Sequence, residues 1–168
     1  MSQPLNEQAL LWSSVDSDGV VSVALSHMLG ELTAAEGMRA GWLRAEDTAH
    51  LLQLLHANRL GLALWTMQDE AQLPQICQSL CEVRECSPET ICLVYAEQLH
   101  WKLLSSLVEA GAQLIVRDVP GLQLRLPRAV ACAPRSQRGL HPLTSGLVER
   151  LERHFASRQP ESAGLAPK

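Results

Sequence analysis

The sequence has no long apolar run, no excess of basic residues and no recognisable leader. Its apolar runs fall far short of the ~20 residues that a membrane-spanning helix needs, so we expect no membrane partner. The 14 basic residues are mixed with 18 acidic ones, and without a basic stripe we expect no nucleic-acid partner. The first residues, MSQPLNEQ, lack the pattern of a signal peptide, and the five cysteines are odd in number. We therefore expect reduced thiols in the cytoplasm.

Motifs that hold metals or nucleotides are missing as well. Cys77 and Cys81 are one helical turn apart, with Cys86 nearby, but no second pair or histidine set completes a zinc site. Their spacing matches a buried helix face, so we interpret them as core cysteines. The chain also has no G-x-G-x-x-G or G-x-x-x-x-G-K pattern. We therefore expect no cofactor and no metal.

A strand–helix–strand unit between residues 90 and 120 is the clearest pattern present. A short apolar run at 91–95 predicts a strand, and a second at 114–116 predicts another. Between them, apolar residues recur at helical spacing, and Gly111 stands where the helix must end. The helical stripe consists of Leu99, Leu103, Leu107 and Ala110, with Leu104 and Val108 beside it. Such a unit places its two strands parallel.

The preceding residues repeat this alternation. Apolar runs at 9–12, 38–43 and 60–65 predict strands, and helical periodicity predicts helices over 20–32, 48–58 and 73–81. A turn-rich loop is expected over 13–19, with Asp16 or Asp18 capping the first helix, and Asp47 is expected to cap the second. Alternating strands and helices predict a parallel sheet with helices on both faces. Trp12 and Trp65 are expected in its core.

The C-terminal third is less regular. Pro127 interrupts a helical pattern over 119–131, which predicts two short pieces or a kink. A loop is expected from 133 to 141, followed by an amphipathic helix that docks either on its own domain or on a second copy. Its apolar line consists of Leu143, Leu147, Leu151 and Phe155. We divide the chain into an α/β domain (8–132), a loop with this helix (133–156) and a disordered tail (157–168).

Residues 8–131 resemble the receiver domain of bacterial response regulators. The segment RLGLALWT, at 59–66, stands where that family has its third strand, and LVEAGA, at 107–112, is similar to the family's L-x-E-A-G-A entry into strand five. The resemblance implies a three-layer, flavodoxin-like α/β fold with a five-stranded parallel sheet in the order 2-1-3-4-5. Its site would lie at the carboxyl ends of the strands, between strands one and three.

The family's chemistry uses an acidic pair for Mg²⁺, an acceptor aspartate, a Ser or Thr, and a Lys at these strand ends. The resemblance places these functions, in order, on Ser13 and Ser14, Thr66, Tyr95 or Ala96, and Arg117. Arg117 alone keeps its charge type, and a threonine hydroxyl is a poor nucleophile without an adjacent base. Two serines do not supply the charge that Mg²⁺ needs. We therefore expect a degenerate receiver that has lost aspartyl phosphorylation.

The function predicted from the sequence is a non-catalytic regulatory or protein-interaction module, with a different protein or a second copy as partner. Trp101 lies beside the stripe of the fourth helix, part of the family's partner surface, and is either an exposed anchor or folded onto the sheet. The terminal helix offers a second contact.

An enzyme or a ligand-binding protein that uses the strand-end cleft near Ser13, Thr66 and Arg117 is the alternative. A Ser–His–Asp triad would combine Ser13 or Ser14 with His100 and Asp118, but no G-x-S-x-G elbow surrounds either serine.

Overall fold

Five parallel strands form the centre of the structure, in the order β2-β1-β3-β4-β5. The computed structural model describes residues 8–16, 19–98 and 100–137. The strands are β1 (Gln8–Val15), β2 (Arg39–Arg44), β3 (Leu62–Thr66), β4 (Ile91–Tyr95) and β5 (Leu114–Val116). Their order and direction confirm the fold class predicted from the sequence.

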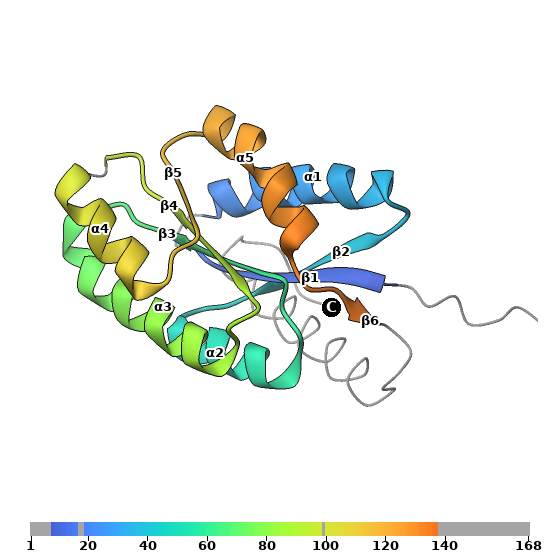
Figure 1. Ribbon diagram of the computed structural model, residues 1–168, viewed down its shortest axis with the longest axis horizontal. Coiled ribbons are helices and arrows are strands. Elements are labelled where there is room, and N and C mark those ends of the chain that lie inside the picture. Colours follow the sequence, from blue (N-terminus) through green and yellow to red (C-terminus); the bar gives the residue numbers. More distant parts are fainter. Residues whose placement is uncertain (1–7, 17–18, 99, 138–168) are drawn as a thin grey trace, which may run out of the picture.

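Helices cover both faces of this sheet (Figure 1). One face carries α1 (Val20–Ala35) and α5 (Val119–Cys132). The other carries α2 (Thr48–Ala57), a short 3₁₀ turn at Glu70–Gln72, α3 (Leu73–Cys86) and α4 (Trp101–Ala110). No helix in the described part of the chain is long and apolar enough to cross a membrane.

Successive side chains of each strand point to opposite faces of the sheet, so the strands contribute to two separate hydrophobic cores. On β3, Trp65 packs under α2–α4, whereas Leu64 packs under α1 and α5. On β1, Trp12 packs under α1 and stacks on Trp42 of β2, with the two rings 5.2 Å apart. Trp12 and Trp65 are each 1% exposed, so their predicted burial is confirmed.

The first strand is longer than the sequence suggested. We expected it to end at Trp12, with Ser13 and Ser14 in a loop, but β1 continues to Val15 and both serines are fully buried. The Ser13 hydroxyl donates to the Leu43 carbonyl of β2, and the Ser14 hydroxyl accepts the indole N–H of Trp42. Because both hydroxyls have partners, the strand continues without an unsatisfied polar group.

The expected break at Pro127 is wrong in one respect, because α5 runs as one helix through the proline. Pro127 itself lies on the exposed side, where one backbone hydrogen bond is lost. The helix continues past the proline because Leu122, Leu126 and Val130 are all buried against the sheet. Burial of three apolar side chains outweighs the local cost of about 3 kcal/mol.

The segment after α5 returns to the sheet. We expected a loop from 133 onward, but β6 (Ser136–Gln137) pairs antiparallel with Gln8 and Ala9 of β1. The return passes against Gly61, where an added Cβ would lie 2.7 Å from the carbonyl oxygen of Pro134. The amphipathic helix expected at 143–155 and the tail lie outside the described residues.

Candidate functional site: the carboxyl edge of the sheet

Four residues form a row across the carboxyl edge of the sheet. Thr66 ends β3 and pairs with Tyr95, which ends β4 and pairs with Val116 of β5. Val15 of β1 pairs with Trp65, so the next residue, Asp16, lies level with Thr66. This edge, at the switch point between β1 and β3, is where open parallel sheets bind ligands.

Asp16 joins β1, β3 and α1 through its carboxylate. Its Oδ1 accepts the Thr66 hydroxyl at 3.0 Å, and its Oδ2 accepts the Ser22 backbone N–H at 3.0 Å. The Ser22 hydroxyl lies 2.9 Å from the same Oδ2. Asp16 is only 7% exposed. The residue at the N-cap of α1 is Gly19, so Asp16 does not occupy the cap position, but its carboxylate accepts a backbone N–H from the first turn of α1.

The hydrogen bonds continue from Asp16 to the far side of β1. The Ser22 hydroxyl is also 2.9 Å from Ser14 Oγ, which accepts the Trp42 indole N–H at 2.9 Å. A polar chain therefore runs from Trp42 through Ser14, Ser22 and Asp16 to Thr66. Sequence reasoning missed Ser22 and Trp42, which lie on two other elements, and no motif links them.

The register of β1 against β3 shows which of its residues reach the edge. Ser13 and Ser14 pair with Ala63 and Leu64 of β3, which places them behind the edge rather than on it. Asp16, and neither serine, stands beside Thr66. A carboxylate therefore stands beside Thr66, where the resemblance had placed two neutral serines.

Not all of the other predicted site residues lie at this edge of the sheet. Tyr95 lies at the edge with Thr66, but Ala96 is buried and donates its backbone N–H to Val116. Burial raises the pKa of Tyr95, and the negative charges of Glu97 and Asp118 raise it further, so its phenol stays neutral. Arg117 lines a different hollow, beside α4 and α5.

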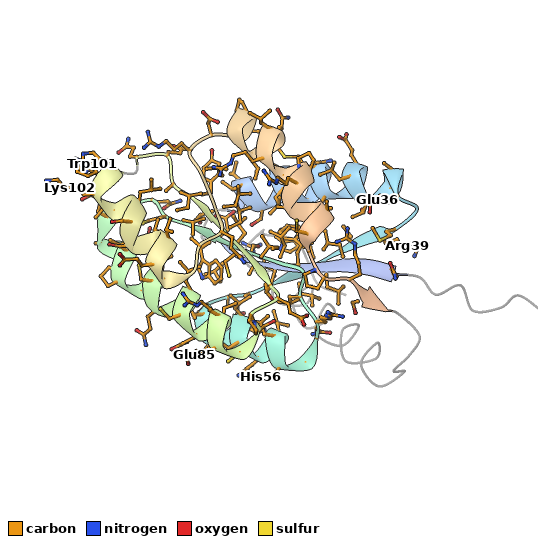
Figure 2. The ribbon with its side chains drawn as sticks, in the orientation of Figure 1. Glu36, Arg39, His56, Glu85, Trp101 and Lys102 are labelled. Carbon is orange, nitrogen blue, oxygen red and sulfur yellow. The ribbon has the colours of Figure 1, made fainter. Side chains whose placement is uncertain are left out.

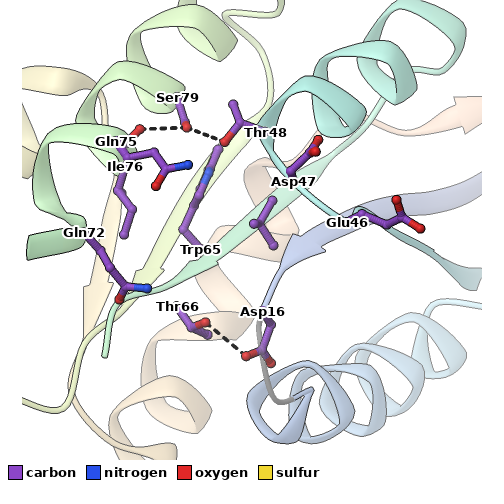
Figure 3. A pocket seen from close by; sticks show the side chains of 11 residues that line it. Asp16, Glu46, Asp47, Thr48, Trp65, Thr66, Gln72, Gln75, Ile76 and Ser79 are labelled. Atoms are coloured by element: carbon purple, nitrogen blue, oxygen red, sulfur yellow. Dashed lines mark hydrogen bonds between the residues drawn. The ribbon is translucent and has the colours of Figure 1, made fainter. Parts of the chain in front are cut away.

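Two hollows lie on either side of the Asp16–Thr66 hydrogen bond. One, of about 290 Å³, extends toward Tyr95 and Glu97. The other, of about 180 Å³, lies between the first turns of α2 and α3, and we call it the α2–α3 pocket (Figure 3). Ser13, which is fully buried, and Arg117, which lies elsewhere, line neither of them.

The residues at this edge do not fit a magnesium ion of the receiver type. No three His, Cys, Asp or Glu side chains among residues 8–16, 19–98 and 100–137 are grouped so that they could hold a metal. Mg²⁺ requires near-octahedral oxygen ligands, normally including carboxylates. Here the carboxylate oxygens of Asp16 already accept hydrogen bonds from Thr66 and Ser22.

Neither the core-cysteine interpretation nor the triad holds in full. Cys77 is half-buried and burial raises its pKa, but Cys81 is exposed, so placing Cys81 in the core was wrong. Cys86, which lies nearby, is exposed as well. The triad does not form, because His100 caps α4 by accepting the Lys102 N–H and Asp118 caps α5 by accepting the Gly121 N–H.

The outer side of α4 presents apolar side chains to solvent. Trp101 is 69% exposed, Leu104 39% and Val108 55%, which favours the exposed alternative for Trp101. Trp101 and Lys102 project from the end of α4, and the Lys102 ammonium lies 5.8 Å from the Trp101 ring (Figure 2). Leu104 and Val108 also line a hollow, together with Ile115, Arg117 and Arg125. We call this region the α4 surface.

Several solved structures of similar fold are response regulators or receiver domains. A response regulator from Thermotoga maritima aligns with a TM-score of 0.59 and 17% identity, covering 73% of this chain and 98% of its own. A CheY-like protein, tadZ, from Pseudomonas aeruginosa aligns with a TM-score of 0.55 and 14% identity, covering 71% and 98%. A putative pilus assembly-related protein from Burkholderia pseudomallei gives 0.54 and 17%, covering 80% and 97%. At these identities the likeness establishes a receiver-like fold.

Comparison of sequences alone gives no further information. No family model matches the chain, and no curated protein matches it.

Proposed function

We propose that this chain is a receiver-like regulatory module that takes up no phosphoryl group and acts through contact with a protein partner. The observation that carries the proposal is the hydrogen bond between Thr66 and Asp16. A neutral hydroxyl stands where the receiver resemblance calls for the acceptor carboxylate. The carboxylate nearest to it is already bound to protein donors on β3 and α1.

The geometry of Thr66 also argues against a nucleophile of another kind. Asp16 accepts the Thr66 hydroxyl hydrogen, as a general base would. However, the other oxygen of Asp16 accepts two hydrogen bonds from Ser22, so the carboxylate is held between β3 and α1 by protein donors. The arrangement suits a structural role better than catalysis.

The α4 surface supports contact as the mode of action. Exposed tryptophan is enriched among the residues that dominate protein interfaces. Trp101, Leu104 and Val108 lie on one side of a helix at i, i+3 and i+7, so a partner can bury all three together. Arg117 and Arg125 at the border of the adjoining hollow favour a partner with acidic groups there.

Substitution of Val108 by aspartate tests this proposal in the full chain. A charge in the middle of the α4 surface should abolish capture of the specific partner from the organism of origin, measured by quantitative affinity purification. Val23→Asp is the matched control, because Val23 is 51% exposed on α1, on the other face of the sheet. Equal recovery of the same proteins by wild type and Val108→Asp would contradict the proposal.

A further inference from the structure

One outer strand of the sheet is long enough to accept a further strand. β2 and β5 are the outer strands of the five that run parallel (Figure 1). β5 has three residues, whereas β2 has six and, in the described part of the chain, pairs with β1 alone. Short outer strands resist pairing with another chain, and long ones favour it. The free side of β2 is therefore the candidate for a contact through the backbone.

The hydrogen bonds of β2 show which of its residues face outward. The Ala45 N–H donates to the Ser14 carbonyl of β1 at 3.1 Å. Because backbone groups alternate in direction along a strand, the odd-numbered residues of β2 bond to β1 and the even-numbered ones face away from it. The outward residues are Ala40, Trp42 and Arg44, all partly exposed. Their outward N–H and C=O groups have no hydrogen-bond partner among the described residues. We call this row the β2 edge.

Trp42 presents a flat aromatic face at the β2 edge. Its ring stacks on Trp12 of β1, with the centroids 5.2 Å apart and the planes 5° from parallel. The Trp42 indole N–H donates to Ser14 Oγ at 2.9 Å, which fixes the orientation of the ring. Because neighbouring strands lie ~4.8 Å apart, the two rings stack along the direction in which a further strand would add. A ring on that strand, opposite Trp42, would continue the stack.

We propose that the β2 edge pairs antiparallel with the β2 edge of a second copy of this chain, so that two sheets join into one. The outward rows match fully in one register, in which Trp42 lies opposite Trp42 of the second copy and Ala40 lies opposite its Arg44. All the outward residues then exchange backbone hydrogen bonds. The two Trp42 rings meet at the twofold axis and extend the stack from one copy to the other. A second copy fits because it supplies both the matching row and the aromatic ring.

The arginines of β2 do not oppose this pairing. Like charges directly opposite each other would destabilise a strand pair, but in this register Arg39 lies opposite Ala45 of the second copy. The Arg44 guanidinium is turned toward the start of α1, where its Nη2 would lie 3.5 Å from a Cβ at Gly19. Asp47, which follows β2, comes to the same end of the strand pair as Arg39 of the second copy. These opposite charges favour association.

The proposed contact leaves the α4 surface available. β5, whose Ile115 lines the hollow of the α4 surface, is the outer strand on the opposite side of the sheet from β2. The inference is therefore independent of the proposed partner contact. Because two short strands bury little area, we expect a reversible dimer with a dissociation constant on the order of 10 µM.

Sedimentation velocity of the full chain over a range of concentrations tests the contact. Proline at position 40 removes an outward N–H and no bond to β1, because Ala40 faces away from that strand. Ala40→Pro should weaken the dimer about tenfold or more, whereas Ala40→Val adds bulk, keeps the N–H and should not. Val108→Asp, on the α4 surface, is the control for the other surface and should leave the dimer unchanged.

Four results of these measurements would overturn the proposal. A wild type that stays monomeric up to about 200 µM would do so, since the expected dimer is then fully formed. A dimer of unchanged affinity in Ala40→Pro would show that the β2 edge is not involved, and a dimer lost in Val108→Asp would place the contact on the α4 surface. Equal losses in Ala40→Pro and Ala40→Val would show an effect of bulk instead of strand pairing.

A pair of cysteine variants tests the register and does not depend on the folding of Ala40→Pro. In the proposed register, residues 40 and 44 of the two copies have Cα atoms about 5.5 Å apart, which a disulfide can span. A mixture of Ala40→Cys and Arg44→Cys should therefore form a 40–44 disulfide under mild oxidation, identified by peptide mass spectrometry. Neither variant alone should link through its new cysteine, because like positions lie roughly 13 Å apart. A mixture without the 40–44 disulfide would contradict the proposal.

Discussion

The Thr66 hydroxyl donates a 3.0 Å hydrogen bond to Asp16 Oδ1 across the carboxyl edge of β1 and β3. This bond joins a neutral hydroxyl and a carboxylate at the switch point of the sheet, between the ends of β1 and β3. It also connects β3 to the first turn of α1, because the other oxygen of Asp16 accepts from Ser22. The edge is thus fixed by protein groups, in an arrangement that contributes to stability.

Thr66→Val should destabilise the protein. Valine has the shape of threonine but cannot donate, so Asp16 Oδ1 loses that donor in a site only 7% exposed. Leaving such a group short of a partner costs about 1–3 kcal/mol, measurable by urea denaturation. Thr66→Ser, which keeps the hydroxyl, should retain most of the stability. Equal midpoints for Thr66→Val and Thr66→Ser would show that the bond contributes nothing.

Two glycine substitutions should act in opposite directions. Gly61→Ala would place a Cβ 2.4 Å from Leu10 Cδ1 and 2.7 Å from the Pro134 carbonyl oxygen, so the chain must shift. We expect a loss of roughly 1–3 kcal/mol. Gly30→Ala, in α1, meets nothing within 4 Å and should stabilise by about 0.5–1 kcal/mol. Thermal melts of both variants measure these changes. An unchanged melting temperature for Gly61→Ala would mean that residues 133–134 do not pack against Gly61.

The cysteines should differ in reactivity. Burial raises the pKa of Cys92 to about 12, whereas Cys81, Cys86 and Cys132 are exposed. Because the thiolate is the reactive form, iodoacetamide at neutral pH should modify the three exposed cysteines and spare Cys92 until the protein unfolds. Peptide mass spectrometry measures this. Modification of Cys92 in folded protein at the same rate would contradict its burial.

The raised pKa of Cys92 also predicts how the stability of the protein changes in alkaline solution. Between pH 9 and about 12 the folded state keeps the Cys92 proton that the unfolded state has lost, so the free energy of unfolding falls as pH rises through this window. Below pH 9 both states are protonated and Cys92 makes no pH-dependent contribution. A Cys92→Ala variant should show a shallower decline, by chemical denaturation at several pH values.

The fold was predictable because its strands are apolar runs with clear ends. The predictions for β4 and β5 match the structure residue for residue. Polar residues bound the β5 run on both sides, and Thr90 precedes the β4 run. The end of β1 was missed because Ser13 and Ser14 resemble turn residues. Their partners, Leu43 and Trp42, belong to β2, and no local pattern shows that a buried hydroxyl will be satisfied from another strand.

The site was harder to predict for the same reason. Thr66 and Tyr95 were placed correctly at the strand ends, but Asp16 was considered as a helix cap alone. Its hydrogen bond to Thr66 depends on the register of β1 against β3, and the error of three residues in the predicted end of β1 concealed that register. Cys81 was misplaced because it lies at the border of the helical stripe rather than within it.

The amphipathic segment 143–155 leads to a prediction beyond the described residues. A free helix of this length is marginal in water, so its apolar line must be buried, and we expect that to happen on its own domain. Leu147→Asp with Leu151→Asp should then lower the melting temperature without changing the concentration dependence of sedimentation, since each buried Leu contributes about 1.5–3 kcal/mol. A dimeric wild type with a stable monomeric variant would identify the helix as an oligomerisation element instead.

Incubation with acetyl phosphate and Mg²⁺, followed by intact-mass and peptide mass spectrometry, tests the central claim most directly. A receiver with a working acceptor forms a labile aspartyl phosphate of about 80 Da under these conditions, by the chemistry of phosphoryl transfer to a carboxylate. With Thr66 at the end of β3 and Asp16 bonded to it, the account predicts an unchanged mass. A labile adduct of that mass on Asp16, or on another aspartate at this edge, would contradict it.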